Sequence, residues 1–253
     1  MHTVDFQLGG YRFAPGVFQY SAGVVAMEGH HIRRVRFRRP IPMREGFQRI
    51  EALLTALERP RTAFCACEMR SPGQFSEDGF RRFNETYVET LARWGLYDGA
   101  TNPVARSNVC PEIGAPAEPS FHAFCFTVKT DPSETTDVAP SFVVAGSGEA
   151  PEGKNNYRDH IVRLGDIGAE GLREKARFVL AEMERRLGLL GASWRDVTAT
   201  QVYTVHDFHP FLRDEIVTRG AAPDGLTWHF DRPPVVDLEF EMDCRGVADE
   251  RVL

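Results

Sequence analysis

The sequence predicts an α+β protein built from two similar halves, each a sheet with two helices on one face. Candidate strands outnumber candidate helices by two or more to one. The order of elements in the first half returns in the second, which indicates an internal duplication of about domain size. A segment rich in Pro, Ser, Thr and Asp, residues 129–140, separates the halves. We therefore expect an N-terminal repeat over residues 1–130 and a C-terminal repeat over residues 138–253.

The first half begins with two strand candidates, at 17–27 and 32–37. In residues 44–59 the apolar side chains recur at spacings of three and four, which predicts a helix with one apolar face. These side chains are Phe47, Ile50, Leu54 and Leu57. The elements that follow are a buried strand at 61–69, a helix from Ser76 to Gly95, and strands at 105–109 and 120–128.

The second half repeats this order. Strand candidates at 141–150 and 160–168 precede an amphipathic helix at 171–191, which Gly191 ends. The remaining elements are a strand at 196–205, a shorter helix at 208–220, and a strand pair at 226–230 and 235–244. Two helices per half against one sheet give the layered arrangement expected of an α+β protein.

Composition excludes several classes of protein. The 253 residues are 42% hydrophobic and 26% charged, as in an ordinary globular protein. The net charge of -6 argues against a nucleic-acid partner. No apolar run approaches the roughly 18 residues of a membrane span, and the N-terminus lacks the layout of a signal peptide. We expect a cytoplasmic protein with no membrane partner.

The cysteines and histidines indicate no metal or cofactor. Five cysteines lie in apolar runs without a C-x-x-C pair, as reduced buried thiols do: Cys65, Cys67, Cys110, Cys125 and Cys244. His206, His209 and His229 do not have the spacing of a zinc site. The "GDIG" at 165–168 is too short and wrongly placed for a phosphate-binding loop. We expect neither a metal nor a cofactor.

Four motifs resemble those of one family. They are "FRRFNETYVETL" (80–91), "PVARSNV" (103–109), "SGEAP" (147–151) and "LEFEMDC" (238–244). In this order and spacing they are similar to the Rid family, also called the YjgF or L-PSP family. The resemblance covers both halves and implies two chorismate-mutase-like repeats in tandem, each a mixed sheet backed by two helices. It also implies a homo-oligomer, trimers in the usual form, with ligand pockets between repeats or subunits.

The arginine of "PVARSNV" is the main candidate for ligand binding. A guanidinium fixed on a strand presents a planar fork of donors that fits a carboxylate. The resemblance implies that Arg106 binds the substrate carboxylate, and the second half has Thr227 or Trp228 in its place. Asn84 is either a solvated helix residue or a ligand contact. Asn108 lies on the same strand face as Arg106, where the family often has cysteine, which leaves its role open.

The family's final strand carries an acid thought to handle the attacking water. We align this acid with Glu239, with Asp237 and Glu241 as alternatives on the same strand face. In the first half the matching residue is His122. The first half thus has the arginine without the acid, and the second half has the acid without the arginine. This division predicts a composite pocket, formed within one chain or between neighbouring chains. The expected contributors are Arg106, Asn84 and Asn108 from one repeat and Ser147, Gly148 and Glu239 from the other.

These residues predict a hydrolytic deaminase acting on an imine or enamine of a small carboxylic acid, with a 2-oxo acid and ammonia as products. Arg106 would hold the carboxylate and Glu239 would move protons. The tandem form favours a dedicated catabolic or biosynthetic enzyme, for instance one acting on an aminomuconate-like enamine. The alternative is a non-catalytic ligand-binding or assembly protein of the same fold. The acidic net charge argues against an endoribonuclease.

Overall fold

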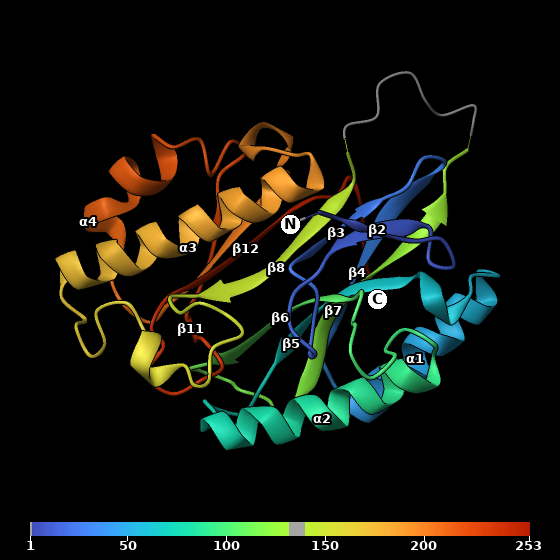
Figure 1. Cartoon of the computed structure of the whole chain (residues 1–253), viewed down its shortest axis with the longest axis horizontal. Helices are drawn as coiled ribbons and strands as arrows, with labels where there is room; N and C mark the ends of the chain where they lie inside the picture. The colour runs from blue at the N-terminus through green and yellow to red at the C-terminus, as the bar shows by residue number, and fades with distance from the viewer. Residues whose placement is uncertain (1, 132–139) are drawn as a thin grey trace.

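The computed structural model describes residues 2–131 and 140–253, which form four layers. Two β-sheets pack face to face in the middle of the molecule (Figure 1). Helices α1 (Met43–Ala56) and α2 (Glu77–Arg93) cover the outer face of one sheet, and α3 (Ala169–Leu190) and α4 (His209–Phe211) cover the outer face of the other. The predicted α+β class is confirmed.

Each sheet is mixed. One consists of β4 (His30–Pro42), β5 (Phe64–Arg70), β6 (Ala105–Pro111), β7 (Ser120–Lys129), β11 (Asp231–Arg232) and β13 (Asp249–Val252), in the order β11-β6-β5-β7-β4-β13. The other consists of β1 (Val4–Phe6), β2 (Tyr11–Ala14), β3 (Gly23–Ala26), β8 (Phe142–Gly148), β9 (Ala199–Tyr203), β10 (Thr227–His229) and β12 (Glu241–Gly246), in the order β1-β2-β3-β8-β12-β9-β10.

The central strands of the two sheets have the same topology. The order β6-β5-β7-β4 in one sheet matches β10-β9-β12-β8 in the other. In both sheets the first two of these strands run parallel and the remaining neighbours are antiparallel. Strands, helices and pairing directions therefore return in one order, which confirms the predicted duplication.

The terminal strands do not stay with their own half. The N-terminal strands β1, β2 and β3 extend the sheet of the second half, because β3 pairs with β8. The C-terminal strand β13 pairs with β4, and β11 pairs with β6, in the sheet of the first half. The boundary between the two sheets therefore does not coincide with the expected boundary between the repeats at residues 130–138. Most of the predicted linker, residues 132–139, lies outside the described residues.

The three long helices follow the apolar periodicity of the sequence. Ser76 caps α2, with its Oγ accepting a hydrogen bond from the Gly79 N–H at 3.1 Å. Gly191 ends α3 with a φ of 74°, a left-handed conformation that glycine adopts without steric cost. The short helical turns are η1 (Arg61–Ala63), η3 (Arg158–His160), η4 (Trp194–Asp196) and η5 (Leu212–Val217), the last of which continues α4.

Some predicted elements of the second half are wrong or too long. Residues 160–168 form no strand, because His160 ends η3 and residues 161–168 run as a loop. The helix expected at 208–220 consists of α4 and the π-helical η5. The strand expected at 235–244 starts only at Glu241, because the preceding residues leave the extended conformation, with Asp237 at a φ of 73°.

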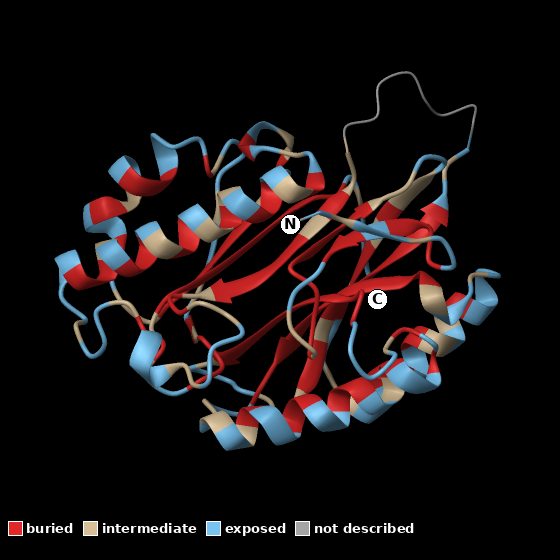
Figure 2. Ribbon diagram, in the orientation of Figure 1, coloured by how far each residue is buried: buried red, intermediate tan, exposed pale blue. Residues whose placement is uncertain are grey.

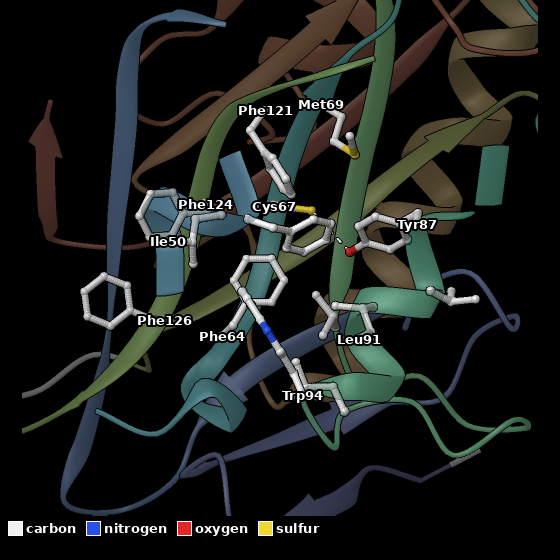
Figure 3. Close-up of a cluster of buried hydrophobic side chains, with 14 of the residues drawn as sticks. Ile50, Phe64, Cys67, Met69, Tyr87, Leu91, Trp94, Phe121, Phe124 and Phe126 are labelled. Carbon is white, nitrogen blue, oxygen red and sulfur yellow. Dashed lines mark hydrogen bonds between the residues drawn. The ribbon is translucent and has the colours of Figure 1, made fainter. Parts of the chain in front are cut away.

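Aromatic side chains fill the core between α1, α2 and their sheet. Figure 3 shows Phe64, Phe121, Tyr87 and Trp94 gathered in this core. The Phe47 ring packs edge-on against Phe121, with centroids 4.9 Å apart. Each fully buried side chain of this size contributes about 1.5–3 kcal/mol to folding. The central strands are largely buried and the edge strands β1, β10 and β13 are mostly exposed, whereas the helices are buried only on the sides that face the sheets (Figure 2).

Between the sheets the contacts are partly polar. The Asp243 carboxylate accepts hydrogen bonds from Ser107 Oγ at 2.6 Å, Gln201 Nε2 at 2.8 Å and the Tyr203 hydroxyl at 2.9 Å. These three donors come from strands of both halves. The Asp243 contacts therefore tie the two sheets together, in addition to the small apolar residues around them.

All five cysteines are free and buried, as predicted. Within the part of the chain that the structure describes, no helix has the length and apolar character needed to cross a membrane.

Candidate functional site

The buried arginine of β6 is the starting point for the site. Arg106 is only 2% exposed. Its Cζ lies 4.7 Å from the ring centroid of Tyr87 and 5.3 Å from those of Tyr20 and Phe83. Among the described residues, its Nε and Nη1 have no hydrogen-bond partner. Aromatic faces stabilise a cation but do not satisfy its N–H donors, so this guanidinium is ready for an anionic acceptor.

A small cavity of about 30 Å³ lies beside Arg106, and both halves of the chain contribute to it. We call it the inner cavity. Its lining residues are Tyr20, Phe80, Arg106, Asn108, Gly146, Gly148, Tyr157, Pro234, Val235 and Glu241. Strands β6 and β8, helix α2 and the start of β12 therefore meet here. Residues from both halves of one chain therefore line the inner cavity.

Glu241 is the acid of the inner cavity. It is the first residue of β12, where it pairs with Gly148 of β8, and it is 4% exposed. Burial raises the pKa of its carboxyl well above the usual value, and the nearby Asp243 and Glu149 raise it further, while Arg186 and Arg106 act in the opposite direction. The Glu241 carboxyl is therefore set to carry a proton at a pH where an exposed glutamate is ionised.

Gly146 allows this close approach. A Cβ atom at Gly146 would lie 2.2 Å from Glu241 Oε1 and 3.2 Å from the Ser107 Cα. Both distances are below ordinary van der Waals contact, so a side chain at this position would displace the acid.

Two asparagines have amide atoms without partners. Asn108 lines the inner cavity, and its Oδ1 accepts a hydrogen bond from Ser71 Oγ at 2.9 Å. Its Nδ2 has no partner among the described residues. Asn84 of α2 is 1% exposed, and neither its Oδ1 nor its Nδ2 has a partner in the described chain. Buried amides of this kind are normally satisfied, so both are candidates for ligand contact.

A larger pocket adjoins the inner cavity. It has a volume of about 830 Å³ and is lined by Asn84 of α2 and by the loop 151–157, and we call it the outer pocket. Phe80 and Tyr157 line both spaces, and their ring centroids are 6.5 Å apart. Glu77 fixes the loop to α2, because its Oε1 accepts a hydrogen bond from the Tyr157 N–H at 2.9 Å. The Phe80 and Tyr157 rings therefore form the boundary between the two spaces.

The structure brings Arg106, Asn108 and Gly148 together but places the Glu239 carboxylate elsewhere. Glu239 is not among the residues that line the inner cavity. Its Oε2 lies 2.7 Å from His206 Nε2 and 3.2 Å from Arg232 Nη1. Of the three acids considered from the sequence, Glu241 is the one beside Arg106. Asp237 forms an ion pair with Arg158 instead.

Ser147 also faces away from the cavity. It pairs with Met242, which belongs to the core beneath α3. Its hydroxyl lies 3.3 Å from the Gly148 carbonyl oxygen. Gly148, the next residue, lines the cavity.

His122 does not take part in the cavity either. It lies on β7, and burial lowers its pKa to about 3, with the neighbouring Arg70 acting in the same direction. The His122 imidazole is therefore neutral at physiological pH. It is not equivalent to Glu241 as a proton donor.

Sequence reasoning missed the aromatic part of the site. Tyr20, Phe80 and Tyr157 come from three segments that contact one another only in the folded chain. Phe80 is in the "FRRFNETYVETL" motif, which was a usable signal. No sequence pattern indicated Tyr20, because this residue lies beside β3, a strand that joins the sheet of the other half.

The fold and the cavity together define a class: an α+β protein with duplicated mixed sheets, in which a buried arginine and a buried carboxyl with a raised pKa line one cavity. A family model described as 2-aminomuconate deaminase CnbZ matches residues 3–251. The 2-amino-5-chloromuconate deaminase of Comamonas testosteroni is 50% identical over 251 residues, covering 99% of each chain. The chain belongs to the CnbZ family of 2-aminomuconate deaminases. This membership supports an enzyme that acts on a C–N bond.

Solved structures give more distant likenesses. A chorismatase matches with a TM-score of 0.47 and 11% identity, over 92% of this chain and 79% of that chain. A member of the YjgF/YER057c/UK114 family from Mycobacterium tuberculosis matches with a TM-score of 0.29 and 19% identity, over 44% of this chain and 82% of that chain. The duplicated sheets and the motif order, rather than these likenesses, support the tandem Rid-like organisation.

Proposed function

We propose that this protein hydrolyses the enamine or imine of a 2-aminomuconate-type acid to a 2-oxo acid and ammonia. The observation that carries the proposal is the pairing of two buried groups across one cavity. Arg106 has two guanidinium nitrogens without a partner in the described chain, and Glu241 has a carboxyl with a raised pKa. The family and the 50% identical deaminase of a chloro-substituted aminomuconate support the choice of substrate.

Arg106 binds the carboxylate next to the amino-bearing carbon. Its Nε and Nη1, unpartnered among the described residues, donate to the two carboxylate oxygens. This contact fixes the C–N bond beside Glu241, so the reacting atoms do not have to find each other from solution. The unpartnered Nδ2 of Asn108 donates a further hydrogen bond in the same cavity.

Glu241 moves the protons. The Glu241 carboxyl gives its proton to the enamine carbon, which converts the enamine to the iminium form. The resulting carboxylate takes a proton from water as the water oxygen bonds to the iminium carbon. The same proton then goes to the amine nitrogen. As the C–N bond breaks and ammonia leaves, the hydroxyl of the intermediate gives its proton back to Glu241 and the carbonyl forms, which restores the protonated acid. One water is consumed for each ammonia released, and no oxidant or reductant is needed.

The substrate occupies both spaces. The inner cavity, at about 30 Å³, holds about two water molecules, so it has to widen to admit the carboxylate and the reacting carbon, and it cannot hold a six-carbon chain. The rest of the molecule extends between Phe80 and Tyr157 into the outer pocket, where Asn84 offers an amide without a described partner. The two rings have to separate for this, so we expect Tyr157 to move when substrate binds.

A coupled assay tests the proposal. 2-Aminomuconate is generated in situ, and ammonium release is measured with and without the protein. We expect clear acceleration by the wild type and a ten- to hundredfold loss of apparent affinity in Arg106→Ala, because a charged hydrogen bond is worth about 1.5–3 kcal/mol. Arg93→Ala, at the exposed end of α2, is the matched control and should behave as the wild type. No acceleration by the wild type would overturn the proposal.

A further inference from the structure

A fully buried ion pair lies next to the strand that carries Glu241. Lys175 Nζ of α3 is 3.1 Å from Glu149 Oε1, and both side chains are 0% exposed. Lys175 Nζ also donates to the Val162 carbonyl oxygen at 2.8 Å. Taking two charges out of water is strongly destabilising unless further hydrogen bonds satisfy them. Because burying both charges is costly, we expect this pair to have a role other than packing.

The other contacts of Glu149 point to that role. Its Oε1 accepts a hydrogen bond from the Glu239 N–H at 2.6 Å, and its Oε2 accepts one from the Phe240 N–H at 3.1 Å. These are the two backbone groups directly before Glu241, at a point where the chain is not yet paired in β12. The Glu149 carboxylate therefore fixes the backbone from which the Glu241 side chain projects into the inner cavity.

Glu149 also affects Glu241 through its charge. The groups that act on the Glu241 carboxyl are Asp243 of its own strand, Glu149 after β8, Arg186 of α3 and Arg106 of β6. Tyr157 of the loop and Cys110 of β6 lie within range of the same carboxyl. Glu149 and Asp243 are the acids in this set, and they oppose ionisation of Glu241, while the two arginines favour it.

We propose that the Glu149–Lys175 pair is a positioning unit for Glu241: it fixes the backbone before the acid and supplies a negative charge that keeps the acid protonated. Burial raises the pKa of the Glu149 carboxyl. Lys175 and the N–H groups of Glu239 and Phe240 act in the opposite direction, so these contacts favour the ionised carboxylate. This inference rests on the proposed function of Glu241 as the proton donor. It assigns Glu149 and Lys175 to the reaction although neither touches the inner cavity.

The first test is the pH profile of kcat in Glu149→Gln. The substitution keeps the size of the side chain and one acceptor oxygen but removes the charge. The Glu241 proton should then be lost more easily, so we expect the alkaline limb of kcat to move toward acid by about one pH unit. The control is Glu215→Gln, a buried carboxylate held by Arg177, whose alkaline limb should not move.

A second variant separates this effect from loss of folding. Glu149→Gln alone leaves the Lys175 charge unpaired and buried, which destabilises the protein. Glu149→Gln combined with Lys175→Met removes both charges, so the double variant should fold and show the same acid shift. A purely structural role would lower the folded fraction at every pH and leave the limb in place. An unmoved limb in both variants, with an active wild type, would overturn the inference.

Infrared spectroscopy gives a readout that does not depend on activity. The carbonyl stretch of the protonated Glu241 carboxyl is identified as the band lost in Glu241→Gln. Its midpoint should lie at lower pH in the double variant than in the wild type. An unchanged midpoint would count against the inference. A wild type that shows this titration but no deamination would refute the proposed function and leave the Glu149 effect standing.

Discussion

Glu239 and Glu241 show how strongly surroundings decide the chemistry of a carboxyl group. Glu239 is partly exposed, and its carboxylate lies between His206 and Arg232, outside the inner cavity. Glu241 is buried beside another acid, and the effects that raise its pKa outweigh those of Arg106 and Arg186. An ionised carboxylate cannot donate the first proton of the proposed reaction, and a protonated one can. The surroundings of the two carboxyl groups therefore favour Glu241 as the acid.

Exchanging each of the two acids for glutamine tests this assignment. Glu241→Gln should lower kcat by about 10²–10⁴-fold, the usual size of a general acid–base contribution, with a small change in KM. Glu239→Gln is the matched control two residues away, and it should keep kcat within a few-fold of the wild type. Steady-state deamination rates give both values. A large loss of kcat in Glu239→Gln, with little change in Glu241→Gln, would instead identify Glu239 as the acid.

The pH dependence follows from the direction of the Glu241 pKa. Its protonated form is the active one, so activity is full below this pKa and is lost as the pH rises through it. Burial, Asp243 and Glu149 raise the pKa, which moves the loss to higher pH than for an ordinary glutamate. Asp243→Asn removes one of the acids and should move the alkaline limb toward acid. A limb that moves toward alkali would contradict this reasoning.

The sequence could not separate Glu239 from Glu241. In an extended strand, residues two apart point to the same face, so alternation treats both acids alike. The strand begins only at Glu241, and Asp237 has a positive φ just before it. Where a strand begins depends on its pairing with β8 and β9, and these partners are distant in sequence. Arg106, Asn108 and Gly148 were predicted in the pocket because each lies within a paired strand.

At the scale of elements, an irregularity in β8 decides which side chains enter the cavity. The pairing of β8 with β12 shifts between Met242 and Cys244, so that Ala145 and Gly146 together oppose Asp243. Before the shift Val144 faces α3, and after it Ser147 faces α3 as well. Simple alternation from Val144 would have put Ser147 in the cavity. One extra residue therefore reverses the prediction for Ser147.

Gly146→Ala tests the close approach that this irregularity creates. The added Cβ would meet Glu241 Oε1 and the Ser107 backbone, so we expect at least a tenfold loss of kcat and a loss of about 1–3 kcal/mol in the free energy of unfolding. Gly188→Ala on α3 is the control, because a Cβ there meets no atom within 4 Å. It should stabilise the helix by about 0.5–1 kcal/mol without changing kcat. Chemical denaturation and steady-state rates give both quantities.

At the scale of the whole molecule, the helices were predictable and the exchange of terminal strands was not. The apolar spacing of Phe47, Ile50 and Leu54 is a local pattern, and these residues lie in the core beneath α1. The pairing of β3 with β8 depends on which edge is free after the chain has folded. A short apolar segment near the N-terminus has the same pattern whichever sheet it joins.

This exchange predicts that the halves do not fold separately. Residues 138–253 alone lack β1, β2 and β3, and the edge of β8 is then open. We expect this fragment to show little cooperative unfolding by circular dichroism and to aggregate. Adding residues 1–29, which carry the missing strands, should restore a cooperative transition. A fragment 138–253 that unfolds cooperatively by itself would show that the predicted repeat is an independent domain.

Because one chain supplies both Arg106 and Glu241, mixing two impaired variants should not restore an intact site. Arg106 and Glu241 line the same cavity of one chain, so each chain holds a complete pair whatever its state of assembly. Arg106→Ala and Glu241→Gln, each strongly impaired alone, should therefore stay impaired when they are unfolded together and refolded as a mixture. The expected activity is that of the two variants measured separately. If the pocket were shared between chains, equal mixing would leave about one site in four intact, and about a quarter of the wild-type activity would return.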